Sequence, residues 1–348
     1  MKQYKVFILL AITFSLNFWQ QTYAQIEVNI IKHYNNENDS SSYLEFPIIA
    51  SDNPLIKEKI NTFLQAKELH LLVGHENKHI FERCYNNKTH LGKASILYTL
   101  ISNTTNNFSF RLKEEINGLT VHNYNLYYNF NPKNGDVYYW QDFFDSIKKQ
   151  KFIDMVAPLL CNLIPDSDDN KKILTDTYQK ELTENFYLTK DSILFDIFND
   201  LYENEKYNIT NTTIGLPINK FKHLLNEYGY SALISGKNLD NFSSSNEEQL
   251  YKGITNKGKE FYFTYLCNYI NYEGQKSYIG EGIYTNTNKI YFLDDGNYKD
   301  SEIIFHCTIN NNNGYEGLFS FKREGNNFKG KCTNKKGKKQ FTFTAKKM

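Results

Sequence analysis

The stretch YNLYYNF at residues 124–130 sets the pattern for the first half of the chain. Tyr124, Leu126, Tyr128 and Phe130 alternate with asparagines and a further tyrosine. A period of two residues puts these four large side chains on one face of a β-strand. Such a face usually packs into a core. Because aromatic rings also stack on sugars, Tyr124 and Tyr128 are candidates for ligand binding.

Further elements flank this strand on both sides. Downstream, a Pro-Lys-Asn-Gly turn at residues 132–135 leads into residues 136–140, which are predicted to return as a hairpin partner. Upstream, residues 95–101 and 108–112 have strand-like composition or alternation. Residues 55–69 place apolar side chains at three- and four-residue spacing after an Asp-Asn-Pro start, which predicts an amphipathic helix.

Helical patterns then alternate with short strands. The predicted elements are helices at 152–163, with a kink or break at Pro158, and at 171–184; strands at 186–188, 192–198 and 213–218; and a helix at 219–228 that stops at Gly229. Pro217 lacks a backbone N–H, so the strand at 213–218 is expected at a sheet edge.

The composition changes near residue 240. Residues 241–248 are serine-rich and are predicted to be a linker. Beyond them, short strands alternate with Gly- and Asn-rich turns, which favours an all-β meander or small barrel. The predicted fold class is α+β, an antiparallel sheet packed with a few helices and followed by this all-β part. The predicted division is signal peptide 1–24, α+β domain 25–240, linker 241–248 and all-β domain 249–348.

The first 24 residues are typical of a secretory signal peptide. Lys2 and Lys5 precede an apolar run at residues 6–16, and residues 22–24 offer small side chains at a cleavage site. This run is shorter than the roughly 20 residues that span a bilayer. Since the first cysteine is Cys84, no lipid-anchored start is predicted. We expect an exported protein, periplasmic or secreted, with no membrane span after signal cleavage.

Charge and composition narrow the classes of partner. Removing Lys2 and Lys5 from the 40 basic residues leaves 38 against 39 acidic ones. A chain so nearly neutral has no global field for polyanions, so we expect no nucleic-acid partner. The 27 tyrosines and 26 phenylalanines suit half-buried sheet faces. Oligomeric state does not follow from the sequence.

Five scattered cysteines leave the question of disulfides open. They are Cys84, Cys161, Cys267, Cys307 and Cys332. One or two bridges would form in an oxidising compartment, and the odd number leaves at least one free thiol per chain. Cys307 and Cys332 lie in strand-like segments that we take as neighbours, so they are the favoured pair. The alternative is that all five are small buried apolar side chains.

One motif points to zinc chemistry. His75-Glu76-Asn77-Lys78-His79 has the spacing with which a helix places two histidine ligands on one face, with Glu76 beside the metal. Against this, Gly74 weakens the helix start, Lys78 adds positive charge, and the segment falls where a connection is expected. We therefore predict no metal site, no cofactor and no catalytic residues. A zinc hydrolase using His75, Glu76 and His79 is the alternative.

Three further motifs carry a family resemblance. They are residues 128–136 leading to 142–144, the strand pair at 185–188 and 192–195, and residues 214–218 with Phe221, Leu224 and Leu225. In this order they resemble an exported bacterial domain-of-unknown-function family. That family includes the lysozyme-binding ectodomain of an anti-sigma-V factor and accompanies the catalytic part of peptidoglycan deacetylases. The resemblance covers residues 44–228.

The resemblance implies a function in the cell envelope. This chain departs from those relatives because it has neither the membrane span and sigma-binding segment nor a deacetylase domain, so those two activities do not carry over. The expected function is a non-enzymatic, exported binding protein that recognises a peptidoglycan-related glycan or a lysozyme-like protein. The alternatives are the secreted zinc hydrolase and a structural envelope module.

Overall fold

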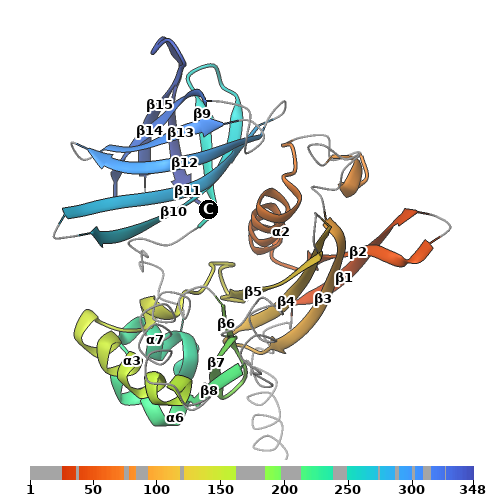
Figure 1. Ribbon diagram of the computed structural model, residues 1–348, viewed down its shortest axis with the longest axis vertical. Helices are drawn as coiled ribbons and strands as arrows, with labels where there is room; N and C mark the ends of the chain where they lie inside the picture. Colours follow the sequence, from red (N-terminus) through yellow and green to blue (C-terminus); the bar gives the residue numbers. More distant parts are fainter. Residues whose placement is uncertain are drawn as a thin grey trace, which may run out of the picture.

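Three β-sheets organise the part of the chain that the structure describes (Figure 1). The structure is a computed structural model. It describes residues 26–36, 39–73, 78–83, 93–117, 121–161, 185–196, 213–237, 249–272, 275–286, 290–299, 302–308, 315–325 and 327–348. The predicted signal peptide, the linker at 241–248 and the helix at 171–184 lie outside these residues. The α+β fold class and the β-rich C-terminal part are confirmed.

The first sheet has five strands in sequence order. They are β1 (Glu27–Asn36), β2 (Asp39–Ala50), β3 (Lys93–Asn103), β4 (Phe108–Asn117) and β5 (Val121–Phe130). All neighbours pair antiparallel except β2 and β3, which run parallel with Leu44 opposite Ile96. A parallel pair needs a crossover connection, and helix α2 (Pro54–Leu69) supplies most of it.

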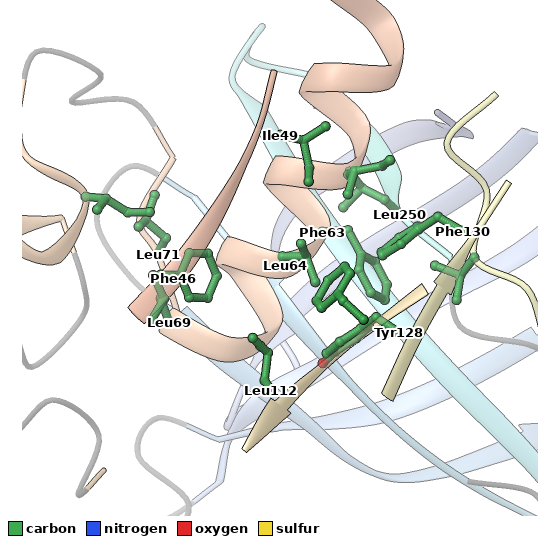
Figure 2. Packing of buried hydrophobic residues seen from close by; sticks show 14 of the residues in the cluster. Phe46, Ile49, Phe63, Leu64, Leu69, Leu71, Leu112, Tyr128, Phe130 and Leu250 are labelled. Atoms are coloured by element: carbon green, nitrogen blue, oxygen red, sulfur yellow. The ribbon is translucent and has the colours of Figure 1, made fainter. Parts of the chain in front are cut away.

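Helix α2 begins and packs as its sequence predicts. Asn53 caps it, because its side chain accepts hydrogen bonds from the backbone N–H groups of Leu55 and Ile56 at 3.0 and 3.4 Å. One face of the helix packs on the sheet, with the Phe63 ring edge-on to those of Tyr128 and Phe130 (Figure 2). Tyr128 and Phe130 of the β5 stripe therefore belong to this core and Leu126 packs against it, whereas Tyr124 lies outside it.

A second core forms below the sheet around short helices and a three-stranded sheet. Its elements are the 3₁₀ turn η3 (Trp140–Phe143), α3 (Ser146–Cys161), β6 (Phe186–Leu188), β7 (Ser192–Asp196), β8 (Thr213–Pro217), α6 (Ile218–Phe221), the 3₁₀ turn η4 (Lys222–Leu224), α7 (Glu227–Tyr230) and a π turn at Ser231–Ser235. Strand β8 lies at the edge, as its proline predicts.

Three local predictions in this region need correction. Residues 136–140 pair with β5 only through the bridge between Phe130 and Val137, and a 3₁₀ turn begins at Trp140. Helix α3 continues through Pro158 to Cys161, so the proline does not break the helix. The helix predicted at 219–228 is broken into α6, η4 and α7. Gly229 lies inside α7 and does not end a helix. The residue is a glycine because a Cβ at this position would come within 2.4 Å of the Phe143 carbonyl oxygen. Its role is close packing.

The C-terminal strands close into an eight-stranded antiparallel barrel. They are β9 (Tyr251–Thr255), β10 (Glu260–Tyr272), β11 (Gln275–Thr285), β12 (Ile290–Lys299), β13 (Glu302–Thr308), β14 (Tyr315–Glu324), β15 (Asn327–Asn334) and β16 (Lys339–Lys347). The sequence did not predict β9, which pairs with both β10 and β16 and so removes the open edges.

Packed aromatic rings fill the barrel interior. Phe261, Phe263, Phe319 and Phe343 are among thirteen buried residues that form a separate core there. Glycines opposite these rings leave room for them. A Cβ on Gly253 would come within 2.2 Å of the Phe261 ring.

The barrel is joined to the first sheet by polar and apolar contacts. Leu250 and Tyr262 pack into the core beneath α2. The Gln249 side chain bonds to both the N–H and the carbonyl oxygen of Val137. The Asp136 carboxylate accepts hydrogen bonds from the ammonium groups of Lys59 on α2 and Lys347 on β16. The side chain of Lys59 is only 4% exposed and that of Asp136 14%, so this ion pair joins the two parts in a largely dry environment.

Replacement of Asp136 by Asn will destabilise the protein strongly. Loss of the carboxylate leaves the Lys59 ammonium buried without its countercharge, which costs about 3–5 kcal/mol. Urea denaturation of the purified protein measures the change. The matched control is Glu324→Gln, which breaks an exposed pair with Lys329 and should cost below about 1 kcal/mol. Equal losses in the two variants would contradict a structural role for Asp136.

Candidate functional site

A large pocket lies where α2 faces one end of the barrel. Its volume is about 880 Å³, within the range of small-molecule sites in proteins. One wall is a face of α2 with residues at helical spacing, Glu58, Thr62, Gln65 and Ala66, continued by residues 71–73 and Arg83. The other wall is the end of the barrel, where strands β9 to β12 and β16 begin or end. The pocket thus depends on the joining of the two parts.

The barrel wall is aromatic. Tyr284, Tyr291, Phe261 and Phe341 line it. The Tyr284 ring lies 5.3 Å from that of Tyr291 and 6.3 Å from that of Phe341, measured between centroids. Tyr284 is buried, whereas Tyr291 and Phe341 are half-buried. These rings offer a ligand an apolar surface with phenol hydroxyl groups nearby.

The charged groups at the pocket are unevenly neutralised. The Glu260 carboxylate pairs with the Lys252 ammonium at 3.1 Å. That of Glu58 accepts a hydrogen bond from the Tyr262 hydroxyl at 3.0 Å. Lys257 and Lys259, on the β9–β10 turn, are exposed at the pocket opening. The opening therefore favours a ligand with a negative charge at one end.

The segment after α2 holds the barrel against the helix. The Thr285 hydroxyl donates to the Leu71 carbonyl oxygen at 2.8 Å, and the Val73 N–H donates to that of Asn286 at 3.2 Å. His70 ends the helix in a left-handed conformation with φ of 46°. Its ring lies edge-on to Phe292 of the barrel at 4.9 Å. These contacts fix the width of the pocket.

A buried charge cluster lies behind this segment. The Lys93 ammonium contacts the carboxylates of both Glu68 on α2 and Glu114 on β4, and Glu68 also accepts a hydrogen bond from the Tyr128 hydroxyl. Burial and the neighbouring Glu68 carboxylate raise the pKa of Glu114 to about 8. Burial also opposes ionisation of Glu68. The positive charge of Lys93 is the main factor that outweighs burial, and the pKa of Glu68 is lowered to about 2.

Two cysteines line the inner part of the pocket. Cys307 on β13 is 3% exposed, and Cys332 on β15 is half-buried. Both are free thiols that hydrogen-bond to each other. This bond and burial raise the pKa of the Cys307 thiol, whereas the same bond lowers that of Cys332. Our assumption that their strands are neighbours is wrong, because β14 lies between them.

Other residues selected from the sequence lie away from the pocket walls. Tyr128 is 5% exposed and packs in the core, so its ring offers no face for a sugar. Tyr124 is half-buried on β5 and stacks on His122. His79 is exposed before the 3₁₀ turn η1 (Ile80–Glu82), whereas His75 and Glu76 lie outside the described residues. The metal-site alternative stays untested.

The residues that the structure describes contain no group of three or more His, Cys, Asp or Glu side chains that could hold a metal ion. No helix among them is both long and apolar enough to cross a membrane. Apart from Cys307 and Cys332, the pocket residues were missed by sequence analysis, because α2 and the barrel strands are distant in sequence and no local motif marks the place where they meet.

Comparisons with known proteins identify structural neighbours of unknown function. No family model and no curated protein matches the sequence. A DUF3298 family member from Bacteroides fragilis shares 15% identity at a TM-score of 0.44, covering 61% of this chain and 98% of that one. A DUF3298 protein from Pseudomonas aeruginosa shares 12% at 0.38, covering 58% and 94%. Likenesses of this size carry no information about activity or ligand.

The buried cluster makes stability depend on pH. Unfolded, Glu114 ionises near its usual value of 4.5, whereas in the folded protein its pKa is about 8. Between these values the folded state holds the extra proton, so the cluster's contribution to stability falls as pH rises from about 5 to 8. Glu68 contributes the opposite slope, but only below its usual pKa of 4.5. Glu114→Gln should stabilise the protein at pH 8 relative to wild type and flatten this slope.

Urea denaturation at several pH values between 5 and 8 tests this dependence. The matched control is Glu115→Gln, which removes a carboxyl from the same strand but not from the cluster. A slope that is unchanged in Glu114→Gln would show that Glu114 carries no proton in the folded state.

Proposed function

We propose that this protein is an exported, non-enzymatic binding protein of the cell envelope. Its binding site is the pocket between α2 and the barrel, and its ligand is a peptidoglycan-related glycan fragment that carries a carboxylate. The observation that carries the proposal is the lining of the pocket, with aromatic rings on one wall, amides and hydroxyls around them, and two exposed lysines at the opening.

The lining matches the chemistry of such a ligand. Sugar rings present C–H faces, which pack on aromatic rings such as those of Tyr291 and Phe341. Hydroxyl and N-acetyl groups require donors and acceptors, which Thr62, Gln65 and Asn286 provide. Muramyl peptides also carry carboxylates, which suit the lysines at the opening. A volume of about 880 Å³ accommodates a disaccharide with part of its peptide.

The pocket favours binding over hydrolysis. Of the two carboxylates that line it, Glu58 is bonded by the Tyr262 hydroxyl and Glu260 by Lys252. Glycoside hydrolysis needs one carboxyl group that holds a proton and a second that is ionised, on opposite sides of the scissile bond. Both pocket carboxylates instead hold neighbouring side chains in place. We therefore expect a bound glycan to be released intact.

Calorimetric titration of the whole protein with a soluble disaccharide-peptide from peptidoglycan tests the proposal. Tyr291→Leu keeps an apolar side chain but removes the ring face, and should weaken binding about tenfold, or about 1.4 kcal/mol. Replacing Lys257 and Lys259 together by Gln should weaken binding several-fold at low salt and reduce its salt dependence. The affinity for chito-oligosaccharides, which lack the carboxylate, should be the same with and without the two lysines.

The matched control is Lys329→Gln. Lys329 is an exposed lysine on β15 near the β14–β15 turn, at the other end of that strand from Cys332. The Lys329→Gln variant should bind the disaccharide-peptide with the affinity of the wild type. Failure of the wild-type protein to bind any of these glycans at millimolar concentration would contradict the proposal. Retention on immobilised lysozyme without glycan binding would show that the partner is a protein.

A further inference from the structure

We propose that Cys307 and Cys332 form a two-coordinate binding site for a soft d¹⁰ metal cation, of which Cu(I) is the physiological example. The site lies at the inner part of the pocket and is independent of the glycan proposal. It uses both thiols as ligands and the pocket as the route of entry. The inference follows from the placement of the two sulfur atoms, the side chains around them, and their access to solvent.

The barrel brings the thiols together without placing their strands side by side. Cys307 on β13 is opposite Gly317 of β14, whereas Cys332 on β15 is opposite Phe319 of β14. Residues 317 and 319 are on the same face of β14, so both thiols lie over this strand on the inside of the barrel. Gly317 lets the backbone of β15 approach β14 closely. A Cβ there would lie 1.8 Å from the Thr333 carbonyl oxygen, so the position excludes other residues.

This placement disfavours a disulfide. Adjacent strands are about 4.8 Å apart, so the Cα atoms of strands separated by a third are roughly 9–10 Å apart. The Cα atoms of a disulfide are rarely separated by more than about 6.8 Å. Joining Cys307 to Cys332 would therefore require β13 and β15 to move together across β14. A cation bound between two thiolates bridges a wider gap than a disulfide does. Two metal–sulfur bonds of about 2.3 Å allow the sulfur atoms to be up to roughly 4.6 Å apart.

The surroundings select the class of metal. Zinc requires four ligands in its structural sites and three in its catalytic ones. No third His, Cys, Asp or Glu joins the two thiols in the described part of the chain. The polar groups beside the thiols include the Tyr284 hydroxyl, which accepts a hydrogen bond from the Asn286 amide at 2.9 Å, and the Asp294 carboxylate, whose negative charge acts on Cys307. Soft thiolate pairs in apolar surroundings suit Cu(I), which accepts two-coordinate sulfur ligation.

Access separates the two cysteines from ordinary buried ones. Cys307 is enclosed by the aromatic core of the barrel, including Phe305 and Phe319. Cys332 is half-buried, and both residues line a cavity that opens between α2 and the barrel. A cation can therefore reach the sulfur atoms while the barrel stays closed. Binding replaces two thiol protons by one metal ion, and the protons leave to solvent.

The test is a competition for Cu(I) under anaerobic, reducing conditions. Purified, metal-free, full-length protein is titrated into the coloured Cu(I)–bicinchoninate complex, and copper transfer is measured by absorbance. The wild type should take up one Cu(I) per chain. Cys307→Ser and Cys332→Ser should each lower the affinity by at least about 100-fold. The matched control, Cys161→Ser in α3, should bind as the wild type does.

Two further measurements make the result decisive. X-ray absorption at the copper edge should show two sulfur ligands and no nitrogen, and circular dichroism should show that the serine variants are folded. Unchanged copper uptake in the Cys307→Ser, Cys332→Ser double variant would overturn the proposal. Recovery of a peptide cross-linked through Cys307 and Cys332 from air-exposed wild-type protein would also overturn it. Neither outcome depends on whether the pocket binds a glycan.

Discussion

The structure depends on one helix, α2, that packs against two units at once. One side of the helix is buried on the five-stranded sheet. Glu58 and its neighbours lie on another side, which is directed toward the barrel. A helix enclosed in this way cannot expose all of its charged side chains to water, so they must find partners inside. Lys59 pairs with Asp136 and Glu68 with Lys93. Because a buried pair is costly when either partner is missing, these contacts specify one position of the helix.

The same constraint produces the pocket. The barrel core is filled with rings, and the pocket lies at the end of the barrel that faces α2. The helix cannot close this end completely, because the bonds from Thr285 to Leu71 and from Val73 to Asn286 hold the segment after the helix at a fixed distance. The space that remains has walls from segments that are distant in sequence, since Glu58 and Tyr262 are 204 positions apart. The pocket is therefore a consequence of the joining of the two units.

Sequence periodicity predicted the elements whose formation depends on interactions between residues close in sequence. Helix α2 and strands β3 to β5 follow from spacing and capping, and the C-terminal strands follow from alternation and turn residues. Closure of the barrel did not follow, since it depends on β9, a five-residue strand that pairs with β10 and β16. Gly229 was misread as a helix stop, because only the approach of Phe143 explains it. The core role of Tyr128 was predicted by period, whereas its bond to Glu68 was not.

Cys307 and Cys332 show why strand-like segments that follow closely in sequence need not be paired in the sheet. They lie 25 positions apart in strand-like segments, and pairing of neighbouring strands would have made a disulfide natural. A meander instead inserts β14 between them, so their Cα atoms are separated by two strand spacings while both residues line the pocket. Gly317 lets the backbone of β15 pack closely on β14, since a Cβ there would lie 1.8 Å from the Thr333 carbonyl oxygen. The two thiols therefore line one cavity from strands that are not neighbours, which suits two separate ligands better than a covalent bridge.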